Sequence, residues 1–222
     1  MLGAQKFLEA VKVGDTAQVK KMLMIEPALA NARTDSGVSA VMLAAYHGRG
    51  EIRDLLIERG AAFNIHESAA FGKMERMAEL VAQDPTLVNA FAADGFAPLA
   101  LAAFFGQKDA VEWLLAHGAD VNTVSKNASG YTALTGAVAR GNAEIVRLLL
   151  KHGANANHRY GPGYSALHEA AASGKIEIVK LLLEHGADSS ARTEEGMTPL
   201  EMAEAKGQTE AASLLSKRGA TA

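Results

Sequence analysis

Seven glycines recur at nearly constant spacing, and this periodicity constrains the fold more than any other feature of the sequence. Each follows an alanine-rich segment and precedes a second apolar segment, with spacings of 34, 24, 34, 35, 33 and 33 residues, and the set is Gly14, Gly48, Gly72, Gly106, Gly141, Gly174 and Gly207. A period of about 33 residues indicates an array of repeated helix pairs. One pair cannot bury its own apolar face, so neighbouring pairs must stack into a continuous core.

The residues at fixed positions within the period explain how each pair forms. Pro98 and Pro199 lie in the first turn of a predicted helix, where the missing N–H of proline costs nothing. The second helix begins near a glutamate such as Glu144, whose charge favours the positive end of the helix dipole. It ends at a His-Gly or Arg-Gly step, because glycine readily adopts the left-handed conformation that closes a helix.

The clearest copy, Gly163 to Asp188, resembles an ankyrin repeat, and the resemblance covers essentially the whole chain. It implies an all-α ankyrin-repeat solenoid of stacked helix-turn-helix units with β-hairpin or loop fingers. Only one copy keeps the histidine of the T-P-L-H motif, at His168, which predicts weaker hydrogen bonding between turns. Related helix starts follow Gly37, Gly95, Gly130 and Gly196.

We predict a single domain over residues 1–222, because no linker rich in proline, serine or glycine divides it. The approximate repeats are 2–36 (an N-terminal cap), 37–64, 65–94 (a stub repeat), 95–129, 130–162, 163–195 and 196–222 (a C-terminal cap). Both terminal pairs carry charged residues at outward positions, as terminal repeats require. We therefore expect no repeat to be missing at either end.

The third repeat departs from the period. Three residues separate Asn64 from Ser68, whereas twelve separate Asn31 from Ala44 in the preceding repeat, so about nine residues are missing. We predict that this repeat lacks its finger, that its first helix is a stub near Glu67 to Phe71, and that the groove has a gap there.

Two helix exits depart from the Gly-Ala-Asp pattern. Residues 26–31 and 84–89 are led by a proline instead. This exit, together with a stub repeat, resembles bacterial ankyrin proteins, so a bacterial source is predicted.

Composition excludes several classes of protein. The chain has no cysteine, which rules out disulfides and thiolate metal sites. Its net charge of −3, with dispersed lysines and arginines, predicts no nucleic-acid partner. The longest apolar run, Phe96 to Phe105, is ten residues and too short to span a membrane. The first residues lack an apolar signal segment, so we expect a cytoplasmic monomer without a membrane partner.

Apparent catalytic and metal motifs have structural explanations. His168-Glu169 begins like H-E-x-x-H, but Ala172 replaces the second ligand. His117, His152 and His185 recur once per repeat at helix ends, which places them roughly 10 Å apart. We therefore predict no catalytic residue, no metal ligand and no cofactor.

Aromatic residues fall repeatedly at positions expected to face the concave side. Adjacent helical residues point about 100° apart, so Phe104 and Phe105 cannot both face the groove fully. Trp113 occupies a core slot of the second helix instead. The predicted partner-binding residues are Tyr46, His47, Phe71, Phe96, Phe104, Phe105, Tyr131, Arg140, Tyr160 and Tyr164.

These observations favour a non-catalytic module that binds a protein or an extended peptide along its concave, aromatic-rich groove. The alternative is a small-molecule-binding or enzymatic protein that uses the gap at the stub repeat, lined by His66, Glu67 and Phe71. A third hypothesis is a structural or self-associating role through the exposed aromatic residues.

Overall fold

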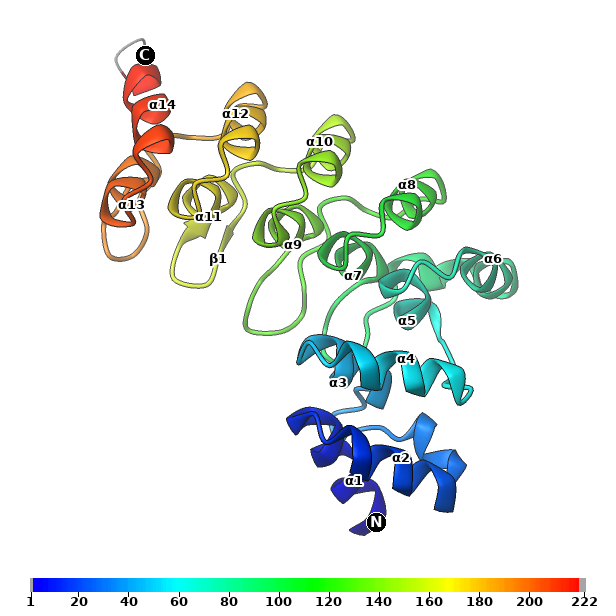
Figure 1. Cartoon of the computed structure of the whole chain (residues 1–222). Helices are drawn as coiled ribbons and strands as arrows, with labels where there is room; N and C mark the ends of the chain where they lie inside the picture. Colours follow the sequence, from blue (N-terminus) through cyan, green and yellow to red (C-terminus); the bar gives the residue numbers. More distant parts are fainter. Residues whose placement is uncertain (1, 220–222) are drawn as a thin grey trace.

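A computed structural model describes residues 2–219, which form a curved stack of seven helix pairs (Figure 1). The first helices are α1 (Leu2–Val13), α3 (Ala40–Tyr46), α5 (Ile65–Ala70), α7 (Pro98–Phe104), α9 (Ala133–Arg140), α11 (Ala166–Ala172) and α13 (Pro199–Ala205). The second helices are α2 (Thr16–Ile25), α4 (Gly50–Glu58), α6 (Met74–Gln83), α8 (Lys108–Ala116), α10 (Ala143–Lys151), α12 (Ile176–Glu184) and α14 (Thr209–Gly219). The predicted all-α repeat solenoid is confirmed, and the last three residues of the predicted C-terminal cap lie outside the described residues.

The two proline-led exits form short 3-10 helices, η1 (Pro27–Asn31) and η2 (Pro85–Asn89). The finger before α11 is a small antiparallel hairpin of β1 (Arg159–Tyr160) and β2 (Tyr164–Ser165). We call the loops that lead into the first helices, on the inner side of the curve, the fingers.

Several first helices are capped by side chains even where the motif histidine is absent. Thr198 and Glu201 form a reciprocal capping box at the start of α13, and Thr132 does the same with Thr135 at α9. At α11 the motif residue His168 takes this position and also lies 3.1 Å from the carbonyl oxygen of Ala191 in the next finger. Thr135 and Glu201 therefore take the place of the histidine at α9 and α13, whereas α7 begins without a side-chain cap.

Loops at the ends of the second helices are joined by a ladder of asparagine side chains. Asn122 Nδ2 donates to the carbonyl of Gly153 at 3.1 Å, and its Oδ1 accepts from the N–H of Asn155 at 2.8 Å. Asn89 and Asn157 bond to the following loops in the same way. Each asparagine thus satisfies a carbonyl and an N–H that the end of the neighbouring helix leaves free.

This ladder is interrupted at the stub repeat. Asn64 occupies the slot that Asn122 fills later in the chain, but its Oδ1 accepts from the N–H groups of His66 (2.7 Å) and Glu67 (3.2 Å). Because the missing finger brings α5 directly after Asn64, the side chain caps this six-residue helix. It is therefore unavailable to the next loop.

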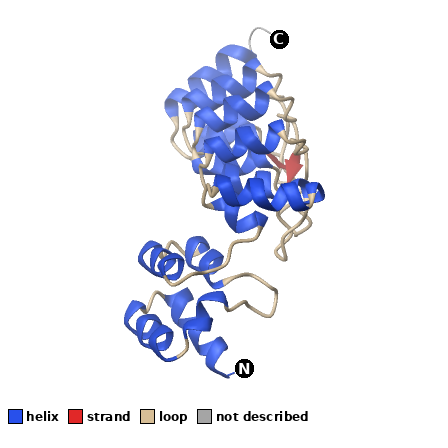
Figure 2. Cartoon of the chain, turned by 90° about the vertical axis from the view of Figure 1, so that its right-hand side faces the viewer, coloured by secondary structure: helices blue, strands red, loops and turns tan. Residues whose placement is uncertain are grey.

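The hydrophobic core also divides at this place. One cluster of buried residues extends from Phe7 to Ala61 and another from Ile65 to Leu215. A small third cluster of Met42, Ala70 and Leu101 lies between them. Figure 2 accordingly shows the first two pairs as a group distinct from the rest of the stack. We call this boundary between α4 and α5 the joint.

Neighbouring fingers meet across the missing one. The finger leading into α3 approaches the finger leading into α7 so closely that a Cβ on Gly37 would lie 2.7 Å from the Cβ of Ala93. Beneath them lies a cavity of about 180 Å³, lined by Arg33, His66 and Glu67 among others. The predicted gap is thus narrowed to a small, partly open pocket, above which the two fingers meet.

Candidate partner-binding cleft

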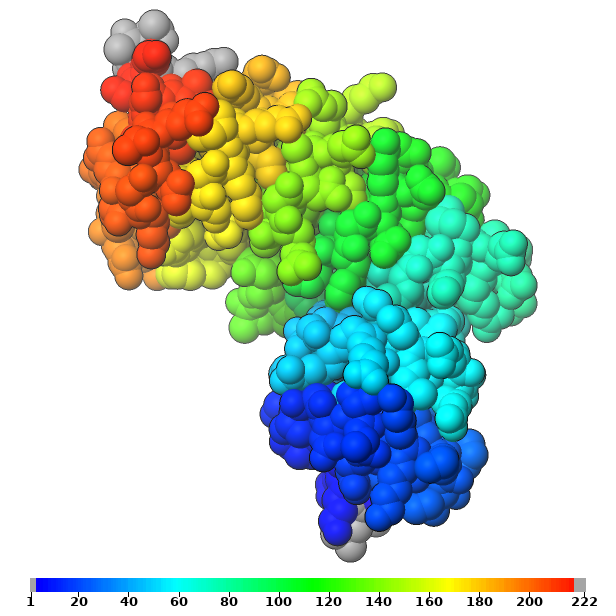
Figure 3. Space-filling model, viewed as in Figure 1, coloured from blue at the N-terminus to red at the C-terminus, as the bar shows by residue number. Residues whose placement is uncertain are grey.

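The inner side of the bend carries one strongly apolar cleft. Figure 3 shows the array bending near its third pair, with the inside of the bend left open. The cleft has a volume of about 190 Å³ and an almost entirely apolar lining of Tyr46, Phe96, Ala100, Leu101, Phe104, Tyr131, Thr132 and Gly136. Its walls therefore come from both sides of the joint, with Tyr46 on the N-terminal side and the others on the C-terminal side.

Two kinds of repeat position supply the aromatic walls. Tyr46 and Phe104 are the last residues of α3 and α7. Phe96 and Tyr131 immediately precede the N-cap residues of α7 and α9. Phe104 and Tyr131 belong to adjacent pairs, whereas Tyr46 lies two pairs from Phe104. It reaches the cleft past the short stub pair, whose equivalent residue is the small Ala70. The repeat frame and the short stub pair therefore bring these four rings together.

Gly136 forms part of the cleft floor, and the aromatic pattern did not predict it. Lacking a side chain in the middle of α9, it leaves the floor open next to Phe104. The signal in the sequence was an isolated glycine inside a helix, since the same slot in the other repeats holds Glu9, Leu43, Glu67, Leu101, Glu169 and Met202.

Tyr46 is fixed across the joint by its hydroxyl group. The phenol Oη donates to Asp94 Oδ2 at 2.7 Å, and the side chain is 37% exposed. Burial raises the pKa of Tyr46 well above its ordinary value, and the hydrogen bond and negative charge of Asp94 raise it further. The phenol therefore stays protonated and keeps donating, which holds its ring against the cleft.

Phe104 and Phe105 point in different directions, in keeping with their positions on the helix. Phe104 lines the cleft, and the guanidinium carbon of Arg140 lies 5.2 Å from its ring centroid. Phe105 packs behind it, with its centroid 5.8 Å from that of Tyr46 and 6.0 Å from that of Phe71. Arg140 thus borders the cleft, whereas Phe105 and Phe71 buttress it.

The remaining candidate residues lie beside the cleft or away from it. Tyr160 makes an edge contact with Tyr131 at 5.0 Å between centroids, and Tyr164 lies 6.4 Å beyond Tyr160. Burial raises the pKa of Tyr160 above its ordinary value. His47 is exposed at the end of α3 and borders a separate shallow hollow with Lys12. Of the ten predicted residues, four therefore line the cleft, five lie beside it and His47 lies apart.

The polar residues of the pocket beneath the two fingers serve the fold. His66 Nε2 lies 2.9 Å from the carbonyl oxygen of Ala90, and burial lowers the pKa of this imidazole. Glu67 Oε2 accepts from the N–H of Asn64 at 3.1 Å, and Oε1 lies 3.4 Å from Arg33. Both groups thus anchor the stub helix, and Phe71 does not line the cavity.

His66 is a second copy of the repeat-motif histidine, counted from Gly72, and like His168 it reaches a carbonyl in the next finger. Two copies of the motif histidine are therefore present, and not one as predicted. His66 was overlooked because the finger is missing, which shifts the start of α5 relative to the motif.

The other recurring histidines act at helix ends. These are His117, His152 and His185. In each of them, Nδ1 lies 2.8 to 2.9 Å from the carbonyl oxygen of the residue four positions earlier. Among residues 2–219 there is no cluster of three or more His, Cys, Asp or Glu side chains that could hold a metal ion. Over the same range, every helix is too short or too polar to cross a membrane.

A stack of capped helix pairs with an open inner face defines a repeat protein of the ankyrin class. The family of ankyrin repeats (3 copies) matches residues 7–124, 65–160 and 156–222, and the chain belongs to this family.

Its similarity to individual relatives is local. It is 40% identical over 87 residues to "Ankyrin repeat and SAM domain-containing protein 6" of Rattus norvegicus, and 39% identical over 87 residues to the Mus musculus protein of that name. It is 32% identical over 89 residues to "Ankyrin repeat domain-containing protein 13C-A" of Xenopus laevis. These matches cover 39–40% of this chain but only 10–17% of the relatives. The relatives are vertebrate, so a bacterial source stays a prediction.

Proposed function

We propose that this chain is a non-catalytic interaction module whose aromatic cleft holds a protein or an extended peptide. Ankyrin repeats are in general modules for protein–protein interaction. The observation that carries the finer proposal is the cleft itself, where Tyr46, Phe96, Phe104 and Tyr131 converge on an apolar floor. Aromatic residues around a desolvated centre are the composition typical of a binding hot spot.

The expected affinity is moderate. Full burial of one aromatic side chain against a partner stabilises a complex by roughly 1.5–3 kcal/mol. Three or four such contacts, after the cost of association, give a dissociation constant of about micromolar. We further propose that the chain acts as a cytoplasmic monomer, without a cofactor or a nucleic-acid partner.

The test is affinity capture from a lysate with quantitative mass spectrometry. The variant carries Phe104→Ala and Tyr131→Ala, and the control carries Met24→Ala and Ile25→Ala. Both controls are apolar and exposed, at 70% and 76%, and neither lines the cleft. We expect the cleft variant to lose partners that the control retains, with both still cooperatively folded. Equal capture by the two variants would contradict the proposal.

A further inference from the structure

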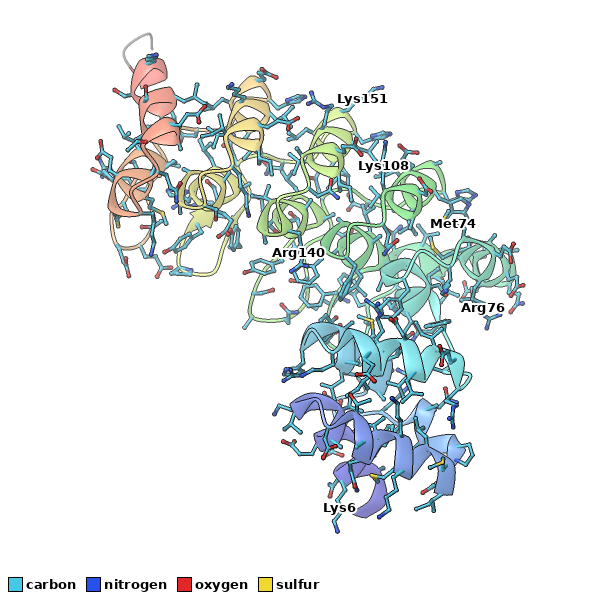
Figure 4. All side chains as sticks on the ribbon, viewed as in Figure 1. Lys6, Met74, Arg76, Lys108, Arg140 and Lys151 are labelled. Atoms are coloured by element: carbon cyan, nitrogen blue, oxygen red, sulfur yellow. The ribbon has the colours of Figure 1, made fainter. Side chains whose placement is uncertain are left out.

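The rim of the cleft carries charges of opposite sign on opposite sides. Arg140 borders Phe104 at the end of α9, on the inner side of the array (Figure 4). Asp94 borders Tyr46 on the other side. A ligand that enters the cleft therefore meets a cation at one edge and an anion at the other.

We propose that the occupant of the cleft is a peptide segment with a large apolar side chain next to a carboxylate. The apolar side chain fills the cleft, and the aspartate or glutamate beside it pairs with Arg140. This inference rests on the proposed function and adds the chemistry of the partner.

The size of the cleft sets the apolar part of the ligand. Its volume of about 190 Å³ exceeds the roughly 150 Å³ of an apolar protein cavity that accommodates benzene. A phenylalanine, leucine or methionine side chain fits such a space. A polar side chain does not, because the lining offers almost no group to replace its hydrogen bonds to water.

The exposed guanidinium of Arg140 determines the charged part of the ligand. Its side chain is exposed, and no carboxylate among residues 2–219 forms an ion pair with it. Arg147, in the following helix, is by contrast paired with Glu177 at 2.9 Å. A guanidinium over an aromatic ring keeps its N–H groups available at its edge, where they bind a carboxylate in bidentate fashion.

Asp94 gives the ligand a direction. Its carboxylate already accepts from the Tyr46 hydroxyl at 2.7 Å and lies 3.4 Å from the N–H of Phe96. A second carboxylate placed there would be repelled and would lack a donor. The acidic residue of the peptide therefore lies toward α9, and the end near Asp94 is neutral or basic.

The experiment is selection from a display library of short random peptides on the whole chain. Wild type is compared with Arg140→Glu and with the control Lys151→Glu, which reverses an exposed charge on the outer end of α10 (Figure 4). We expect wild type and the control to enrich a large apolar residue next to Asp or Glu. Arg140→Glu should keep the apolar residue and replace the acid by Lys or Arg.

A synthetic peptide from the selection supplies the magnitude. Replacing its acidic residue by the matching amide should weaken binding to wild type by about 5-fold. The difference should shrink at high salt, because exposed ion pairs are screened, and it should vanish on Arg140→Glu.

The failures are distinguishable. Enrichment of an apolar residue without an acid, or of the same acid by Arg140→Glu, overturns this inference and leaves the proposed function intact. Enrichment that survives Phe104→Ala with Tyr131→Ala overturns both. No enrichment at all overturns this inference, and the capture experiment then decides the proposed function.

Discussion

Gly136→Ala separates the contribution of the cleft to binding from its contribution to stability, because the two should change in opposite directions. Gly136 lies inside α9 and is not one of the glycines with a positive φ. A Cβ there would lie 3.5 Å from the Cβ of Phe104, 3.7 Å from the carbonyl oxygen of Ala100 and 3.8 Å from the Cα of Phe104. All three are ordinary van der Waals distances, so the methyl group fits without movement.

The expected stabilisation follows from helix propensity. Alanine is favoured over glycine inside a helix by about 1 kcal/mol, which corresponds to a rise in Tm of about 2–4 °C for a chain of this size. The methyl group also occupies roughly 30 Å³, about the share of one water molecule, of a cleft of about 190 Å³. Overpacking by one such group costs at least about 1 kcal/mol, so a ligand that fills the cleft should bind about 5-fold more weakly.

Thermal unfolding and fluorescence anisotropy with a selected peptide measure the two effects. The matched control is Ala137→Gly, the reverse exchange at a neighbouring residue whose side chain is fully buried in the core. It should lower the free energy of unfolding by about 2 kcal/mol and leave the affinity unchanged. A lower Tm for Gly136→Ala would refute the packing argument, and an unchanged affinity would refute the assignment of the cleft.

Other expectations concern the joint, the motif histidine and the asparagine ladder. Tyr46→Phe removes the hydrogen bond to Asp94, so the free energy of unfolding should fall by about 1 kcal/mol and amide hydrogen exchange in α3 should accelerate. Unchanged exchange would show that this hydrogen bond does not hold the two sides of the joint together. Burial lowers the pKa of His168 below its ordinary 6.5, so in acid the unfolded chain binds more protons than the folded one. The contribution of His168 to stability is therefore fully present above pH 6.5 and is lost as the pH falls through the lower pKa of the folded state. Urea unfolding at about pH 7.5 and about pH 5 should show a smaller difference for His168→Gln than for wild type, and equal differences would exclude this histidine as a cause. Asn122→Ala loses both bonds to the next loop and should cost about 1–3 kcal/mol by urea titration, whereas a negligible change would show that the ladder is not needed.

The repeat frame was predictable because it depends on local signals. Helix periodicity, helix-ending glycines and a proline in the first turn act over one or two turns of chain, and the helix pairs followed from them. The short α5 was predictable for the same reason, since the spacing from Asn64 to Ser68 left no room for a finger.

The approach of the two fingers across the missing one was not predictable in this way. It depends on how far the fingers on either side lean toward each other, which is set by packing between pairs that are distant in sequence. The same limit applies to the cleft. Periodicity placed Tyr46, Phe96, Phe104 and Tyr131 on one face, but only their relative positions show that they share one space with Gly136. His66 was missed because the deletion displaces its helix start.

The divided core affects how the molecule responds to force. The stacks on either side of the joint share few buried side chains, so bending there disrupts less packing than separating any other two pairs. Tyr46 stands on one stack and Phe104 on the other, so tension between the two ends would widen the space between these rings before it unravelled a helix. If a partner binds there as proposed, it would connect the two stacks and resist this widening.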